Sequence, residues 1–220
     1  MVLSSRRSRV SRCAAWTAGV ALIASAVSVQ AAPIDRSAVG STALLTAPAR
    51  DLVRRVLASG DNRGLPFAII DKRNARVTVM TADGQARGSS PVLLGLARGD
   101  DSVPGIGERK IADIRPEERT TPAGRFLAEH GVNTNGEDIF WIDYDAAVSM
   151  HRVRANNKAE RRLERLASST PADNRISYGC INVPAAFYDR VIVPTFASFN
   201  VVVYVLPDVK PIANVFGAMY

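Results

Sequence analysis

The amino-acid sequence predicts one mainly β domain with a few helices. Short runs rich in valine, isoleucine and phenylalanine recur along the chain, and turn residues separate them. Only three stretches have the apolar spacing or the composition of helices. The chain has 220 residues, of which 47% are hydrophobic and 22% charged, as is ordinary for a soluble protein with a sizeable core. We find no internal repeat.

The first 31 residues have the features of a secretory signal. A basic stretch from Arg6 to Arg12 precedes an apolar run over residues 14–27, and small residues then lead up to Ala31, after which we expect cleavage. The run is short and rich in alanine and serine for a membrane span, but an uncleaved anchor is the alternative. The rest of the chain carries 24 basic and 21 acidic residues, a net charge of +3 that does not indicate nucleic-acid binding.

A flexible lead-in and a short helix are expected over residues 32–64. Pro48 suits the first turn of a helix that runs to Ser59, and Gly60 can end it. The apolar residues that share one face are Leu52, Val53, Val56 and Leu57.

Strands are expected from Leu65 onward. Residues 67–70 and 76–80 flank a turn at 71–74 and predict a hairpin. Further strand candidates are residues 91–95, 126–127, 139–142 and 200–206. Residues 98–118 are charged and contain several glycines and prolines, which predicts a long surface loop.

Two more helices are expected in the second half of the chain. Residues 156–167 have a helical composition, with Leu163 and Leu166 as the apolar side. The second helix runs from Pro184 to about Ile192, and we expect Phe187, Tyr188 and Val191 to pack inward. Phe140 and Trp141 are interpreted as core. The arginines Arg161, Arg162 and Arg165 form a basic face, interpreted as solvated, with a glycan contact or a lid over a cleft as the alternatives.

Cys180 is the one cysteine that remains after cleavage, because Cys13 lies in the signal. An exported domain with one cysteine is not a disulfide scaffold. The thiol is therefore an inert core residue, a bridge to another chain or a nucleophile. A nucleophilic cysteine needs a base that takes its proton, and the chain has two histidines, His130 and His151.

The local sequence favours the nucleophile. Gly179 lets the backbone turn sharply and leaves the neighbouring amides uncrowded, as an oxyanion site requires. His130 lies in Glu-His-Gly and is interpreted as a loop histidine. One cysteine and two distant histidines give no metal-ligand spacing, so we expect no metal and no cofactor.

Two segments resemble motifs of one enzyme family. Residues 177–182, Ser-Tyr-Gly-Cys-Ile-Asn, are similar to the Ser-His-Gly-Cys-Ile-Arg stretch of the L,D-transpeptidases of the YkuD type, which remodel bacterial peptidoglycan. Residues 121–126, Thr-Pro-Ala-Gly-Arg-Phe, are similar to the family's Thr-Pro-x-Gly-x-Phe segment. The resemblance covers roughly residues 65–206.

The resemblance implies a β-sandwich-like catalytic domain over residues 65–208, followed by a tail over 209–220. Cys180 would attack a peptide-stem carbonyl of peptidoglycan, and His151 would be the general base and acid. The protein would act in the periplasm or cell envelope as a monomer, with no membrane span after cleavage. A Cys–His hydrolase (an L,D-carboxypeptidase) and a non-catalytic peptidoglycan-binding module are the alternatives.

The resemblance also implies supporting roles. The amides near Tyr178 and Gly179 would bind the oxyanion, and Ser177 would support them by hydrogen bonding. Asn182 stands where the family has an arginine and Arg152 where it has a glycine. We expect Asn182, Arg152 and Arg175 to contact the substrate.

Overall fold

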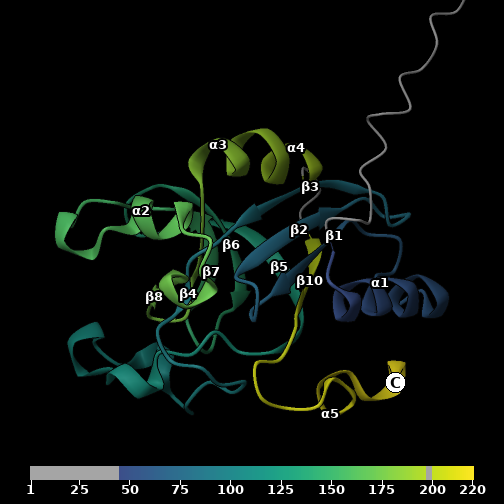
Figure 1. Cartoon of the computed structure of the whole chain (residues 1–220), viewed down its shortest axis with the longest axis horizontal. Helices are drawn as coiled ribbons and strands as arrows, with labels where there is room; N and C mark the ends of the chain where they lie inside the picture. Colours follow the sequence, from purple (N-terminus) through teal and green to yellow (C-terminus); the bar gives the residue numbers. More distant parts are fainter. Residues whose placement is uncertain (1–44, 197–199) are drawn as a thin grey trace, which may run out of the picture. The chain divides into compact units, whose positions relative to one another are not determined.

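One mixed sheet of eight strands carries the fold of this computed structural model, which describes residues 45–196 and 200–220 (Figure 1). The strands are β1 (Phe67–Asp71), β2 (Arg76–Met80), β3 (Ala86–Pro91), β5 (Gly124–Val132), β6 (Asp138–Asp143), β7 (Val148–Arg152), β9 (Ile181–Val183) and β10 (Asn200–Val205). Their order is β3-β2-β1-β10-β5-β6-β7-β9, with β1–β10 and β7–β9 parallel and the other pairs antiparallel. The mainly β fold class is confirmed.

The chain between β3 and β4 (Leu94–Gly95) joins the two edges of the sheet. Val92 N–H donates to the Ala75 carbonyl beside β2 over 2.9 Å. The next residue, Leu93, exchanges two backbone hydrogen bonds of 2.9 Å with Asn182 in β9. β4 then pairs in parallel with β8 (Arg175–Ser177). The eight strands therefore nearly close into a barrel.

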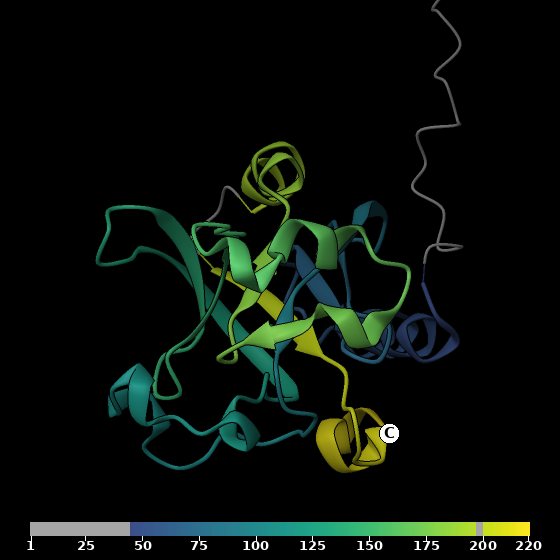
Figure 2. The ribbon, with the colours of Figure 1, turned by 60° about the vertical axis from the view of Figure 1, so that its left-hand side comes forward.

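Alternating side chains divide the apolar residues between two faces of the sheet. One face is the larger core, which includes Phe140, Met150 and Ile181. A helical run covers it, formed by α3 (Ala185–Phe187), a π-helical segment (Tyr188–Ile192) and α4 (Val193–Thr195). The other face packs against α1 (Ala47–Ser59) and α5 (Ile212–Phe216). Figures 1 and 2 show α1 and the run α3–α4 on different sides of the strands.

The predicted first helix is confirmed. Thr46 caps α1, Pro48 lies in its first turn, and Gly60 ends it with a φ of 68°. Three of the four predicted core positions of α1 are buried, but Leu57 is 39% exposed at the edge of the face. The predicted helix from Pro184 is confirmed too, with Tyr188 fully buried.

Other predicted elements differ in extent. Residues 98–118 contain three 3-10 turns, at Ile106–Glu108, Ile111–Asp113 and Pro116–Glu118. The predicted helix 156–167 is split into a 3-10 turn (Lys158–Glu160) and α2 (Arg162–Ala167), because Arg161 takes a left-handed φ of 50° between them. Further 3-10 turns lie at Pro171–Asn174 and Gly217–Met219. Leu166 is buried as expected, whereas Leu163 is 59% exposed.

Two expectations concern the chain's N-terminal part. The predicted signal and its cleavage site lie outside the described residues. Among residues 45–196 and 200–220, no helix has the length and apolar character needed to cross a membrane.

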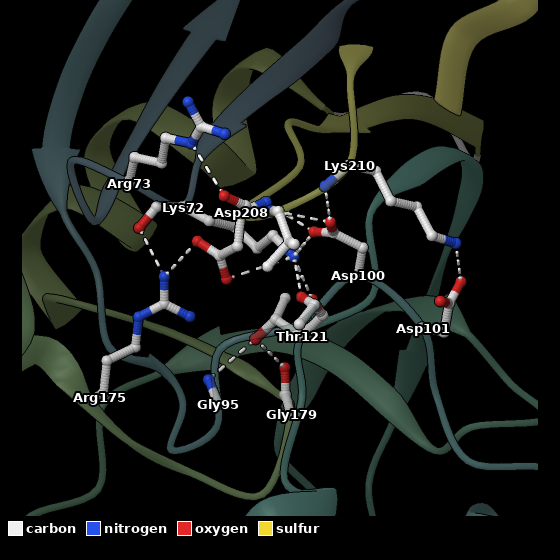
Figure 3. Close-up of polar contacts among 12 residues, drawn as sticks. Lys72, Arg73, Gly95, Asp100, Asp101, Thr121, Arg175, Gly179, Asp208 and Lys210 are labelled. Atoms are coloured by element: carbon white, nitrogen blue, oxygen red, sulfur yellow. Dashed lines mark hydrogen bonds and ion pairs between the residues drawn. The ribbon is translucent and has the colours of Figure 1, made fainter. Parts of the chain in front are cut away.

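A buried lysine at the β1–β2 turn contacts three distant segments (Figure 3). Lys72 is fully buried, and its Nζ donates to the carbonyls of Gly99 (2.5 Å) and Thr121 (2.8 Å) and to Asp100 Oδ1 (2.9 Å). Asp208 Oδ2 lies 3.6 Å from the same Nζ. Burial lowers the pKa of Lys72, and the two carboxylates oppose that shift.

The four charges of this network balance. Arg175 donates to Asp208 Oδ1 over 2.7 Å and to the Lys72 carbonyl over 2.8 Å. Asp100 accepts the backbone N–H groups of residues 208–210. Burial works to raise the pKa of Asp100, but these N–H groups and Lys72 together lower it to about 2. Asp100 is therefore charged at neutral pH, and both Asp100 and Asp208 have a nearby cation.

Replacing Lys72 with methionine should destabilise the protein strongly. The change leaves Asp100 and Asp208 buried with one cation fewer, which typically costs about 3–5 kcal/mol. Urea unfolding of the described domain measures the loss. Lys110→Met, at an exposed lysine, is the matched control and should change the free energy of unfolding by less than about 0.5 kcal/mol. Equal effects of the two changes would contradict the role given to Lys72.

Candidate active site

Two neighbouring parallel strands bring the predicted site residues together. His151 in β7 is directly paired with Asn182 in β9. Met150 and Ile181, the neighbours of these two residues, belong to the larger core, so His151 and Asn182 point to the opposite face. Ser149 lies two residues before His151 in β7 and shares that face. Cys180 comes just before β9, next to all three side chains.

The turn before Cys180 is held by hydrogen bonds from several elements. Ser177 Oγ donates to the Cys180 carbonyl over 2.6 Å and accepts the Gly179 N–H over 3.2 Å. Thr121 Oγ1 donates to the Gly179 carbonyl over 2.8 Å and accepts the Gly95 N–H over 2.9 Å, as Figure 3 shows. The conformation of the turn is therefore tied to Thr121, whose own carbonyl accepts from buried Lys72.

Only glycine fits well at position 179. Its φ is 132°, a value that residues with a side chain rarely adopt. An added Cβ would lie 2.9 Å from the Thr120 carbonyl oxygen. The Gly179 N–H already donates to Ser177, which leaves the amides of Tyr178 and Cys180 as the candidate oxyanion donors.

The Cys180 thiol is half-buried among polar groups. Its Sγ lies 3.6 Å from Ser149 Oγ and 3.6 Å from the carbonyl oxygen of Ala147, which has a left-handed φ of 53°. Burial works to raise the pKa of the thiol, but the hydrogen bond and charge of His151, with smaller contributions from Ser149, outweigh it. The pKa of Cys180 is therefore below its usual range, as expected of an activated cysteine.

The hydrogen bonds of His151 select one tautomer of its ring. Nδ1 lies 2.7 Å from the Arg152 carbonyl oxygen, which can only accept, so Nδ1 carries the proton. Nε2 is then the basic nitrogen, and the Asn182 side-chain amide lies 3.5 Å from it. This arrangement leaves Nε2 able to take a proton from Cys180.

The predicted substrate-binding arginines are engaged elsewhere. Arg175 is 7% exposed and belongs to the buried Lys72 network, so the structure does not bring it to the thiol. The Arg152 guanidinium pairs with Asp138 and Asp189. Arg152 contributes to the site through its backbone carbonyl, because that oxygen orients the His151 ring.

The structure also places Tyr178, His130 and the aromatic residues of β6. Tyr178 is 36% exposed, with the Arg119 guanidinium stacked over its ring. His130 was expected in a loop but lies in β5, exposed and edge-on to Phe140. Phe140 is buried as expected, whereas Trp141 is half-buried against Gly131 and Tyr144.

The basic face of α2 is not uniformly solvated, contrary to expectation. Arg161 pairs with Glu164 at the surface, but the Arg162 side chain is only 14% exposed and reaches Asn182. Sequence reasoning missed this contact and that of Ser149 with the thiol. The only sequence signal for Ser149 was its position two residues before His151. Within the described residues, no cluster of three or more His, Cys, Asp or Glu side chains could hold a metal ion.

Comparisons with known proteins point to one group of structures. No family model matches the sequence, and no curated protein matches it. The solved structures that resemble this fold include L,D-transpeptidase catalytic domains. The L,D-transpeptidase (residues 123–326) of Xylanimonas cellulosilytica DSM 15894 is 12% identical, with a TM-score of 0.38 over 64% of this chain and 60% of that chain.

Two further structures are similar to this chain. The catalytic domain of the E. faecium L,D-transpeptidase is 18% identical, with a TM-score of 0.36 over 64% of this chain and 95% of that domain. The helical cell shape determining protein Pgp2 of Campylobacter jejuni is 16% identical, with a TM-score of 0.41 over 66% of this chain and 49% of Pgp2. The matched region thus spans about half of Pgp2.

Alkylation of Cys180 as a function of pH tests its environment. The pH at which alkylation reaches half its maximal rate should be lower than for an ordinary thiol, because His151 lowers the pKa of Cys180. In His151→Ala the main opposition to the burial of the thiol is lost, so the midpoint should rise. His130→Ala is the control and should leave the midpoint unchanged, since His130 lies on another strand. A midpoint that does not respond to His151→Ala would contradict the pairing.

Thr121→Val tests the support of the Cys180 turn. The change keeps the side-chain shape but removes the hydroxyl that joins Gly95 and Gly179, which should cost about 1–3 kcal/mol. It should also slow the alkylation of Cys180 at neutral pH, because the turn is less well held. Thermal unfolding and alkylation rates measure the two effects. Thr134→Val, at an exposed threonine, should change neither.

Proposed function

We propose that this chain is a periplasmic cysteine transpeptidase of the L,D type that acts on the peptide stems of peptidoglycan. One observation carries the proposal: a thiol with a lowered pKa lies beside a histidine whose Nδ1 proton is bound by the Arg152 carbonyl, which leaves Nε2 as the basic nitrogen. The thiol follows a glycine turn that fits the family's Gly-Cys motif. The predicted export signal would take the protein to the compartment that contains this polymer.

The first half of the reaction forms an acyl-enzyme. His151 Nε2 takes the thiol proton, and the Cys180 thiolate attacks the stem carbonyl carbon between an L-centre and the terminal D-residue. The amides of Tyr178 and Cys180 stabilise the negative charge on the carbonyl oxygen. His151 then returns its proton to the nitrogen of the leaving D-residue, and a thioester remains on Cys180.

The second half transfers the acyl group. An amine of another stem attacks the thioester carbonyl, and His151 Nε2 takes the proton that the amine loses. The carbon–sulfur bond breaks, and the thiolate leaves and regains a proton from His151. The products are a new amide bond and the free enzyme. With water as the acceptor, the same steps give an L,D-carboxypeptidase.

The similar structures support the choice of polymer. They include L,D-transpeptidases and a protein described as a helical cell shape determining protein. The Arg152 and Arg175 guanidinium groups are already paired with carboxylates, so the proposal includes no substrate contact by either side chain. Asn182 is 1% exposed, and its amide faces His151 rather than open solvent.

Incubation of the mature chain with tetrapeptide-stem muropeptides tests the proposed function. Intact-mass spectrometry should show a thioester adduct that maps to Cys180, together with release of the terminal D-residue. Cross-linked or exchanged stems should then form, whereas released D-residue with only hydrolysed stems would identify the carboxypeptidase. Cys180→Ser should give neither adduct nor products. A folded wild-type protein that forms no adduct and releases no D-residue would exclude the enzyme and leave the binding module.

A further inference from the structure

Asn182 is a buried amide with three neighbours at the candidate active site. Its Oδ1 accepts from Arg162 Nη1 over 2.6 Å. Its Nδ2 donates to the Cys180 carbonyl over 3.2 Å and lies 3.5 Å from His151 Nε2. The Asn182 backbone is fixed by its two hydrogen bonds with Leu93, so the amide can change its contacts only by turning about its side-chain bonds.

The orientation of this amide is determined by the chemistry of its partners. A guanidinium can only donate, so it must face the amide oxygen, and a carbonyl can only accept, so it must face the amide nitrogen. Arg162 and the Cys180 carbonyl therefore select the same orientation independently. With Arg162 in place, Asn182 presents an N–H donor, not an oxygen, towards His151 Nε2.

This orientation acts on the protonation of His151. The Asn182 Nδ2–H group can donate to Nε2 only if Nε2 carries no proton. The Arg152 carbonyl, which binds the proton on Nδ1, selects the same tautomer. After Nε2 takes the thiol proton, two N–H groups would face each other. The resting pair of thiol and neutral imidazole is thereby favoured over the pair of thiolate and imidazolium.

Arg162 is well placed to hold the amide. Its side chain is 14% exposed and also pairs with Glu160 through Nε, which steadies the guanidinium at the start of α2. The other charged groups near His151 are paired with one another. They are Glu137 with Arg154, and Arg152 with Asp138 and Asp189.

We propose that Arg162 is a positioning residue of the active site, which acts through Asn182 to set the hydrogen bonding of His151 Nε2. The helix α2 thereby brings a guanidinium to position 182, where the chain has no arginine of its own. The inference rests on the proposed Cys180–His151 chemistry and adds to it Arg162, which lies outside residues 177–182.

A double-mutant cycle on the pH profile of Cys180 alkylation tests the inference. Arg162→Met leaves the amide held only by its 3.2 Å contact with the Cys180 carbonyl, so the amide oxygen can turn to protonated Nε2 more readily. The midpoint should then move down, and alkylation below the midpoint should become about threefold faster or more. In an Asn182→Ala background, Arg162→Met should leave the midpoint unchanged, because its effect passes through Asn182. Arg161→Met, at the neighbouring arginine paired with Glu164, should have no effect in either background.

The outcomes separate this inference from the proposed function. An equal shift with and without Asn182 would mean that the charge of Arg162 acts through space, and the inference would be wrong. No shift in Arg162→Met, alongside the expected shift in His151→Ala, would also overturn the inference but leave the Cys–His pair intact. Thermal unfolding confirms that each variant is folded.

A measurement on the unmodified chain keeps the inference testable if Arg162→Met does not fold. Nitrogen-15 NMR of the imidazoles, with His130→Ala to assign His151, should show a protonated Nδ1 and a bare Nε2 at neutral pH. A proton on Nε2 would contradict the orientation of Asn182 that Arg162 imposes.

Discussion

The buried ammonium group of Lys72 is the interaction on which the arrangement of the site depends. It lies at the β1–β2 turn and joins the loop at Gly99 and Asp100 with the segment at Thr121. Such a group is stable without water only if acceptors and counter-charges surround it, so the segments that supply them must stay in place. Thr121 extends this constraint to the reactive turn, because its hydroxyl bonds the Gly179 carbonyl directly before Cys180.

The reactivity of the thiol results from opposing effects rather than from one strong contact. Burial disfavours the thiolate, whereas His151 favours it and prevails. Ser149 lowers the pKa of Cys180 to a smaller extent. The Asn182 amide presents an N–H group to His151 Nε2 and so disfavours a proton on that nitrogen. A balance of this kind gives a thiol that is easier to ionise than an ordinary cysteine.

Features that depend on residues adjacent in the sequence could be predicted from the sequence alone. Proline at the start and glycine at the end defined α1, and the two strand-like runs that flank the turn at 71–74 defined the first hairpin. The glycine before Cys180 and the motif around it located the candidate nucleophile. The contacts of Lys72, and that of Arg162 with Asn182, could not be predicted. The partners of the Lys72 ammonium lie at least 27 residues away, Asn182 lies 20 residues from Arg162, and both sets of contacts depend on the packing of the sheet. A lysine in a turn and an arginine on a short helix are ordinarily solvent-exposed.

Amide hydrogen exchange tests most directly whether the buried network holds the reactive turn. Wild-type protein and Lys72→Met would be compared by mass spectrometry under conditions in which both are folded. We predict faster exchange in Lys72→Met at the Gly99–Asp100 loop, at Thr121 and at the turn 177–180 together, with α1 unchanged. Faster exchange confined to the β1–β2 turn would contradict the account, because the turn before Cys180 would then be held independently of Lys72.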